Sequence, residues 1–204
     1  MAEQPDGAVG LPDGEDDPSE MLEQAARLII GALHEDPTRE GLIDTPRRFR
    51  DAFMEDFMPN GSPEEALGEM VMEETFDQMI MVRDVPIRSF CEHHILPWFG
   101  RVAIGYIPQD KTVGLSKLTR MVAAVGRGLT IQERCTEKLV LAMNSVLRPV
   151  GCIVVVEAVH TCTLLRGVRT ELQTFTTSAA KGAFLVNPAA RQEFLSLLLR
   201  GSIV

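Results

Sequence analysis

The 204-residue sequence has no long apolar run and little positive charge. No segment approaches the roughly 18 uninterrupted apolar residues that a membrane-spanning helix needs, so an integral membrane protein is excluded. The 20 Lys and Arg face 29 Asp and Glu, but seven of these acids lie in the first twenty residues, so residues 21–204 carry a net charge of only −2. Binding to nucleic acid or anionic lipid needs a broad basic face, so neither partner is expected. An anionic substrate has to be held by a local cluster of cations.

The first seventeen residues contain no Lys or Arg and few apolar side chains. Their composition predicts a disordered acidic leader over residues 1–17, because such a segment buries too little surface to offset the entropy cost of ordering it. The leader lacks the basic start and apolar stretch of a secretory signal, so we expect a cytoplasmic protein with reduced thiols. Two disulfides among the four cysteines are the less favoured alternative. At 45% hydrophobic residues, the chain is typical of one domain, which we place at residues 18–204.

Helix start signals predict a helical N-terminal part over residues 18–70. Asp17-Pro18-Ser19-Glu20 combines a capping Asp, a Pro in the first turn and a Glu three residues after the cap. Apolar residues then follow at helical spacing. Thr45-Pro46 and Ser62-Pro63 predict the starts of a second and a third helix.

The rest of the domain, residues 71–204, mixes strand and helix patterns. Alternating and β-branched segments predict four strands, at residues 76–84, 101–107, 152–160 and 168–177. The first two are expected to form an antiparallel pair joined by a long connection that contains Cys91. Two helices separate the strand pairs, the first capped by Ser116 and the second by a Thr130–Glu133 capping box. With a last helix from Asn187-Pro188, the order predicts an α+β fold with an antiparallel four-stranded sheet.

A sheet of four strands has two open edges, and natural proteins usually cover such edges or pair them. Pairing between copies of the chain is one solution, so we expect a homo-oligomer. A monomer whose N-terminal helices cover the edges is the alternative, and composition alone does not decide between them.

Two short segments carry residue types that bind metal ions. In Cys91-Glu92-His93-His94, a Cys and a His three residues apart can meet at one ion if they lie on a turn. In His160-Thr161-Cys162, residues two apart would face the same side of an extended strand. If the sheet brings the segments together, five candidate zinc ligands gather there. Buried thiols and surface histidines are the alternative interpretation.

The number of protein ligands would decide what a zinc ion does at such a site. Four ligands close a tetrahedral, structural site, whereas three leave a position for a water whose pKa falls to about 7. Two thiolates and one imidazole, with two histidines left over for proton transfer, would form a hydrolytic site. The sequence leaves both possibilities open.

Two groups of cations could hold a phosphate-bearing substrate. Lys117 and Arg120 lie three residues apart at the predicted helix start after Ser116, where backbone N–H groups also favour phosphate. Arg166 and Arg169 follow the second metal-binding segment. Each pair alone is more often a solvated surface, but together they indicate a polyphosphate pocket beside the metal.

Glu133 has two possible roles, because it sits in the first turn of a predicted helix. It can cap that helix, or its carboxylate can accept two hydrogen bonds from the N1–H and 2-amino groups of a guanine. Cys135 and Cys152 lie on apolar stripes and are expected to be core thiols.

Four motifs in this order resemble the GTP cyclohydrolase I family from about residue 21 to 200. They are Cys-Glu-His-His from Cys91, Gly-Leu-Ser-Lys from Gly114, Gln-Glu-Arg from Gln132, and His-x-Cys from His160 with Arg-Gly-Val-Arg after it. Glu-Gly-Leu-x-x-Thr-Pro-x-Arg, residues 40–48, also fits. The resemblance implies a T-fold core over residues 71–204, subunits that form an oligomeric barrel, usually a homodecamer, and active sites between subunits.

The activity implied by the resemblance is hydrolysis of GTP, with water, to 7,8-dihydroneopterin triphosphate and formate, at the entry to folate and pterin synthesis. Carried over by motif, the implied zinc ligands are Cys91, His94 and Cys162, and the implied acid–base groups are His93 and His160. Ser116 would approach the ribose. The triphosphate would be held by Lys117, Arg120 and Arg166, and guanine would be read by Gln132 and Glu133.

One departure from the family concerns phosphate binding. The sequence has no Lys before Lys111, so a contact that some relatives take from an upstream lysine has to come from an Arg or be absent. Two rival functions are a zinc enzyme that acts on another purine and a sheet-forming assembly protein with a closed structural zinc site. Gln132, Glu133 and the downstream arginines favour GTP over the first rival.

Overall fold

The computed structural model describes residues 17–68, 71–72, 76–167, 169 and 173–199. It divides into two compact units, Met1–Met58 and Pro59–Val204, which are described separately. The predicted leader, apart from Asp17, lies outside the described residues. Among the helices in the described part of the chain, none is both long and apolar enough to cross a membrane.

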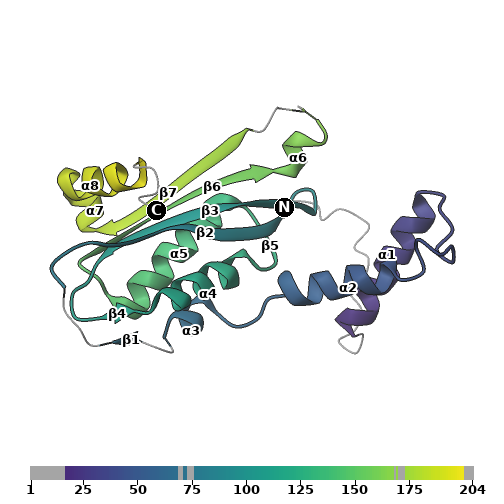
Figure 1. Cartoon of the computed structure of the whole chain (residues 1–204), viewed down its shortest axis with the longest axis horizontal. Coiled ribbons are helices and arrows are strands. Elements are labelled where there is room, and N and C mark those ends of the chain that lie inside the picture. The colour runs from purple at the N-terminus through teal and green to yellow at the C-terminus, as the bar shows by residue number, and fades with distance from the viewer. Residues whose placement is uncertain (1–16, 69–70, 73–75, 168, 170–172, 200–204) are drawn as a thin grey trace, which may run out of the picture. The chain divides into compact units, whose positions relative to one another are not determined.

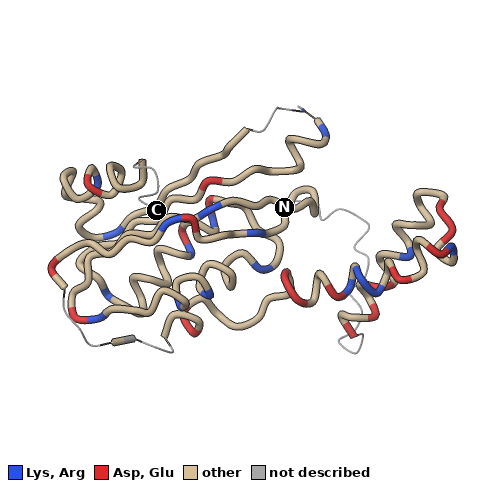
Figure 2. Tube along the Cα trace, viewed as in Figure 1, with Lys and Arg blue, Asp and Glu red and all other residues tan. Residues whose placement is uncertain are grey.

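The first unit contains two helices that begin where the capping signals predict. Helix α1 spans Pro18–Ala32, and the Asp17 carboxylate accepts a 3.0 Å hydrogen bond from the Ser19 N–H. Helix α2 spans Thr45–Asp56. Arg50 of α2 forms an ion pair with Glu23 of α1 at 2.6 Å. Basic and acidic residues are interspersed along both helices (Figure 2).

The second unit holds the sheet and the remaining helices (Figure 1). Its long strands are β2 (Ile80–Cys91), β3 (Leu96–Ile107), β6 (Gly151–His160) and β7 (Thr174–Gly182). Its short strands are β1 (Val71–Met72), β4 (Thr112–Val113) and β5 (Leu129–Thr130). Its helices are α3 (Pro63–Gly68), α4 (Leu115–Gly126), α5 (Gln132–Leu147), α6 (Thr161–Leu164), α7 (Ala183–Val186) and α8 (Pro188–Leu199).

The predicted α+β class is confirmed, and the sheet differs from the prediction in one strand. Within the described residues, the strand order is β5-β2-β3-β6-β7. The four long strands pair antiparallel, as expected. Strand β5 pairs parallel to the end of β2, at Phe90 and Cys91, so the sheet is mixed and five-stranded. A separate pair, β1 and β4, lies outside this sheet.

The long connection predicted around Cys91 is wrong, because β2 and β3 continue to a tight turn at residues 92–95. The predicted strands ended at residue 84 and resumed at residue 101, so they missed the parts of β2 and β3 nearest this turn. Pro86 is tolerated in β2 because β2 is an edge strand at that position. In the described chain, strand β5 pairs with β2 only at Phe90 and Cys91, and β3 lies on the other side of Pro86. The strand predicted at 168–177 is partly outside the described residues, and β7 begins at Thr174.

Two predicted caps do not form. Gly114 is the N-cap of α4, so Ser116 lies inside the first turn. Ile131 is the N-cap of α5 and makes no side-chain capping bond, so Thr130 and Glu133 form no capping box. The caps at Ser62 and Asn187 are confirmed by side-chain hydrogen bonds to Glu65 and Ala189.

The two faces of the sheet are covered by different helices. Helices α4 and α5 pack on one face, where Val102, Ile104 and Val156 meet Leu139 and Met143 in the main core. Helices α7 and α8 cover the other face (Figure 1). There the fully buried Phe194 ring lies over Gly105, where an added Cβ would come within 2.5 Å of that ring.

Phe194→Ala is expected to lower the free energy of unfolding by about 3–5 kcal/mol, because it leaves a cavity over Gly105. Urea unfolding followed by circular dichroism measures the change. Glu193→Ala, at the exposed neighbouring position, is the matched control and should change stability by less than about 0.5 kcal/mol. Equal losses in both variants would mean that α8 is held by something other than the Phe194 side chain.

Candidate active site

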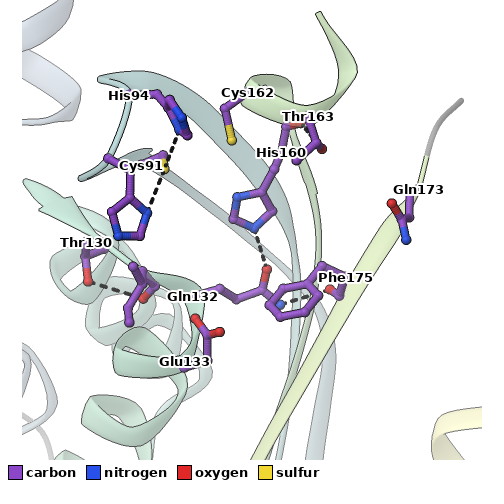
Figure 3. A pocket seen from close by; sticks show the side chains of 12 residues that line it. Cys91, His94, Thr130, Gln132, Glu133, His160, Cys162, Thr163, Gln173 and Phe175 are labelled. Atoms are coloured by element: carbon purple, nitrogen blue, oxygen red, sulfur yellow. Dashed lines mark hydrogen bonds between the residues drawn. The ribbon is translucent and has the colours of Figure 1, made fainter. Parts of the chain in front are cut away.

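A cavity of about 400 Å³ opens where β2 and β6 end and α5 begins. Figure 3 shows that its side chains come from segments far apart in the sequence. The residues that line it are Cys91, His93, His94, Thr130, Ile131, Gln132, Glu133, His160, Cys162, Thr163, Gln173 and Phe175. Seven of the residues predicted from the motifs are therefore brought together in one cavity.

The β2–β3 turn places the first metal-binding segment. Cys91 is the last residue of β2 and is buried, and its carbonyl accepts hydrogen bonds from the N–H groups of His94 and Ile95 at 3.3 and 2.9 Å. These bonds curl the chain so that His94 Nδ1 lies 3.6 Å from Cys91 Sγ. His93 Nδ1 is 3.9 Å from the same sulfur.

The second segment reaches the same place by a different geometry from the one predicted. Strand β6 ends at His160, and Thr161–Leu164 form the helical turn α6, so Cys162 does not lie on a strand. Its thiol still turns back toward the first segment (Figure 3). One ligand atom each from Cys91, His94 and Cys162 lies within 4.8 Å of the other two.

This set of atoms fits a zinc ion. Zn–S bonds of about 2.3 Å and Zn–N bonds of about 2.0 Å in a tetrahedral site put ligand atoms roughly 3.5–3.8 Å apart. The sulfur of Cys91 and the nitrogen of His94 already have that spacing, and a small movement of Cys162 would complete it. Two thiols and one imidazole are also a ligand set that zinc accepts.

The electrostatics of the two thiols favour a bound cation. The pKa of Cys162 is raised by burial and by the neighbouring Cys91 thiol, because two thiolates so close together repel. A divalent cation between them would reverse this effect and deprotonate both sulfurs.

Glu92 connects the metal-binding turn to the start of α5. Its carboxylate forms an ion pair with Arg134, and its N–H donates to the Thr130 carbonyl at 3.4 Å. The hydrogen bond from Arg134 lowers the pKa of Glu92. The turn that carries His93 and His94 is thus attached to the helix that carries Gln132 and Glu133.

His160 is held on three sides at the edge of the cavity. Its ring stacks on Trp98, with centroids 5.3 Å apart and 16° between planes, and meets Phe175 edge-on at 5.9 Å. Its Nε2 lies 2.9 Å from Gln132 Oε1. Burial lowers the pKa of His160, and the Glu133 carboxylate opposes part of that effect.

Gln132 and Glu133 point in different directions from the first turn of α5. The Gln132 side chain is fully buried, and its amide nitrogen bonds to protein acceptors. Glu133 is exposed and lines the cavity, with no capping bond at this helix start. The carboxylate of Glu133 is therefore available to a bound molecule.

Four predicted substrate-binding residues lie outside the lining of this cavity: Ser116, Lys117, Arg120 and Arg166. Helix α4 begins just after β4, and β4 follows the end of β3 where Ile107 pairs with Gly151. That end of the sheet is opposite the end that holds His160 (Figure 1). Arg120 lines a second cavity of about 360 Å³ with Arg127 and Glu65. Arg166 is exposed in the turn after α6.

The motifs do not identify five residues that line the cavity, Thr130, Ile131, Thr163, Gln173 and Phe175, nor Trp98, which stacks on His160. Trp98 is the only tryptophan in the chain, yet it is fully buried. The one signal in the sequence was the position of this single tryptophan, four residues after His94. Thr163 reaches the cavity through the helical turn α6, and Gln173 and Phe175 reach it through the course of β7; local spacing reveals neither.

Cys135 and Cys152 are core thiols, as predicted. Both are fully buried, and burial raises the pKa of each thiol to about 11. All four cysteines lie in the described part of the chain and are free.

An α+β domain with a Cys–His–Cys ligand set, a neighbouring histidine and an exposed carboxylate in one cavity is built like a metal-dependent enzyme. The profile of the family described as GTP cyclohydrolase I matches residues 22–199. The chain belongs to the GTP cyclohydrolase I family, so the family and the enzyme class expected from the motifs are confirmed.

Curated relatives named GTP cyclohydrolase 1 match over most of the chain. The protein from Chlorobium chlorochromatii is 43% identical over 183 residues, which cover 88% of this chain and 81% of that protein. The one from Campylobacter concisus is 43% identical over 88% of this chain and 95% of its own length. The one from Saccharomyces cerevisiae is 41% identical over 90% of this chain and 76% of its own length.

Cys162→Ser and Cys91→Ser are each expected to lose bound zinc, because each removes one of only two thiolate ligands. Elemental analysis of dialysed protein should find about one zinc per chain in the wild type and far less in either variant. Cys152→Ser, a buried thiol outside the cavity, is the control and should retain zinc. Retention of zinc by Cys162→Ser would contradict the ligand assignment.

Proposed function

We propose that this chain catalyses the zinc-dependent hydrolysis of GTP to 7,8-dihydroneopterin triphosphate and formate, with one net water consumed. The observation that carries the proposal is the Cys91, His94 and Cys162 set beside His160 in one cavity, in a chain of this family. On this assignment the product enters folate or pterin synthesis, and the enzyme is cytoplasmic.

The residues that would hold a metal ion are Cys91, His94 and Cys162. A zinc ion with only these three protein ligands would supply an activated water as nucleophile at neutral pH. His93 stays outside the three-residue ligand group and lines the cavity. It therefore serves as a second acid–base group for the later proton transfers.

His160 acts on the purine as a general acid. It protonates N7, which makes C8 more electrophilic toward water and leads to opening of the imidazole ring. A second hydrolysis releases C8 as formate, and the ribose opens, rearranges and closes onto the exposed amine. Burial lowers the pKa of His160, so its protonated form is a stronger acid than a solvated imidazolium, while a smaller share of the rings carries the second proton at neutral pH.

Glu133 holds the guanine. Its exposed carboxylate at the cavity can accept two hydrogen bonds, from N1–H and from the 2-amino group. This pairing distinguishes guanine from adenine, which has no N1–H and no 2-amino group. The lack of a capping bond at this helix start supports the assignment over the capping role.

The triphosphate is held by Lys117, Arg120 and Arg166, and Ser116 approaches the ribose. Because these residues do not line the cavity of their own chain, the proposal requires a second copy to bring the α4 cations to the cavity of its neighbour. The long open edges of β2 and β7 support such an assembly. A T-fold barrel closed between subunits, in a homodecamer, meets both needs with residues 18–204 as one catalytic domain.

The proposal predicts that GTP yields formate and dihydropterin in equal amounts, the pterin being measured by its fluorescence after chemical oxidation. A chelator should abolish both products. GMP and guanosine should turn over far more slowly, since they lack the triphosphate. Equal turnover of all three would remove the triphosphate assignment and favour a zinc enzyme for another purine. Bound zinc with no formate from GTP would favour a structural metal site.

Glu133→Ala is expected to raise KM for GTP by about 10²-fold, since hydrogen bonds to a charged group contribute about 1.5–3 kcal/mol each. The melting temperature should stay near the wild-type value, because Glu133 makes no cap. Glu137→Ala, one turn later at another exposed position of α5, is the control and should leave KM unchanged. A melting temperature that falls together with the activity would return Glu133 to a structural role.

A further inference from the structure

We propose that Gln132 is a positioning residue that fixes the ring and the tautomer of His160, rather than a residue that reads guanine. The inference rests on the proposed function only in giving His160 the proton transfer. It is carried by the contacts of the Gln132 amide, which connect helix α5, strands β6 and β7, and His160.

The chemistry of its neighbours determines which way the Gln132 amide faces. Its nitrogen Nε2 lies 3.0 Å from the Val156 carbonyl oxygen, 2.9 Å from the Phe175 carbonyl oxygen and 3.1 Å from Thr177 Oγ1. Carbonyl oxygens only accept hydrogen bonds, so the NH2 group, and not the oxygen, has to face them. The usual ambiguity between the amide nitrogen and oxygen is therefore removed by the network itself.

The oxygen of the same amide then has to face His160. Gln132 Oε1 lies 2.9 Å from His160 Nε2, and an amide oxygen cannot donate. The hydrogen bond forms only when Nε2 carries the proton. In the neutral ring, Nδ1 is then the nitrogen with the free lone pair, the one that takes up and delivers the transferred proton. Figure 3 shows this nitrogen on the side of the ring that faces the cysteine–histidine cluster.

The aromatic contacts add a restraint that the amide alone lacks. Trp98 pairs directly with His160 across β3 and β6, and its ring lies flat against the imidazole. This stack restricts tilt of the ring, and the bond to Gln132 restricts rotation within the plane. The two contacts together hold Nδ1 in one direction.

The burial of Gln132 argues against direct contact with the base. The side chain is fully buried, and both of its polar atoms are already bonded within the protein. Reading a guanine would break the bonds that the Gln132 amide donates to the Val156 and Phe175 carbonyls, which hold it to β6 and β7. Its neighbour Glu133 is exposed and has no such constraint.

The test compares Gln132→Met with Thr136→Val. Methionine has nearly the length of glutamine but accepts no strong hydrogen bond, so it releases His160 Nε2. Thr136 belongs to the same buried network, through Thr177 at 2.6 Å and the Gln132 carbonyl at 2.9 Å, but it lies outside the cavity lining. It controls for loss of stability in the network.

For Gln132→Met we expect kcat for formate release to fall about 10²-fold, within the range of general acid–base catalysis. KM for GTP and the zinc content should stay within about twofold of the wild type. Thr136→Val should keep kcat within about twofold of the wild type, even if its melting temperature falls as far as that of Gln132→Met. Gln132→Glu is the conservative variant, because one oxygen still accepts from Nε2–H, and its kcat should lie between those of the wild type and Gln132→Met.

A second readout needs no turnover. Trp98 is the only tryptophan, so the fluorescence of the chain reports the ring stacked on it. Emission from Gln132→Met should shift from the wild-type value toward that of His160→Ala, and Thr136→Val should keep the wild-type emission.

Three outcomes overturn the inference. A raised KM with unchanged kcat in Gln132→Met would mean that Gln132 reads the base. Equal losses of kcat in Gln132→Met and Thr136→Val would mean that the network is only structural. Unchanged Trp98 emission in Gln132→Met would mean that the ring does not depend on the amide. If the wild type releases no formate but the emission shifts as expected, the proposed function fails and the positioning of His160 stands.

Discussion

The antiparallel register of β3 between β2 and β6 is the constraint on which the site depends. Cys91 pairs with Leu96 on one side of β3, and His160 pairs with Trp98 on the other. Two segments separated by about seventy residues therefore end at the same edge of the sheet. A shift of one residue in either pairing would turn the side chains of that strand to the opposite face. The cavity exists because both registers hold together.

Helix α5 completes the site with two consecutive residues of its first turn, both of which line the cavity. Gln132 is fully buried and bonds to β6, β7 and His160, whereas Glu133 is exposed. The short parallel strand β5 brings the helix to this point by pairing with the end of β2. The His160 side chain at the cavity is thus held by a buried hydrogen-bond network, in which water does not compete for the bonds.

The cations predicted to bind phosphate do not line the cavity of their own chain. Helix α4 starts at the end of the sheet opposite His160, so the buried Lys117 and its neighbour Arg120 lie in a different part of the domain from the thiols. In the described chain, β7 and most of β2 have no strand paired on their outer side. An active site shared between copies would use the same edges that an isolated chain leaves exposed to water.

Local spacing determined what could be known from the sequence alone. Local spacing was enough to predict the helix starts at Asp17, Ser62 and Asn187, the β-branched run of β6, and two short segments with five candidate metal ligands. The choice of Cys91, His94 and Cys162 among those five came from the family resemblance. The tertiary structure decided the rest, because distant pairing is not written in local spacing. It made β2 and β3 continue through Pro86 and Pro97, turned Gln132 inward, and set Trp98 against His160. It also separated Lys117 from the thiols, because their distance depends on the end of the sheet at which helix α4 begins.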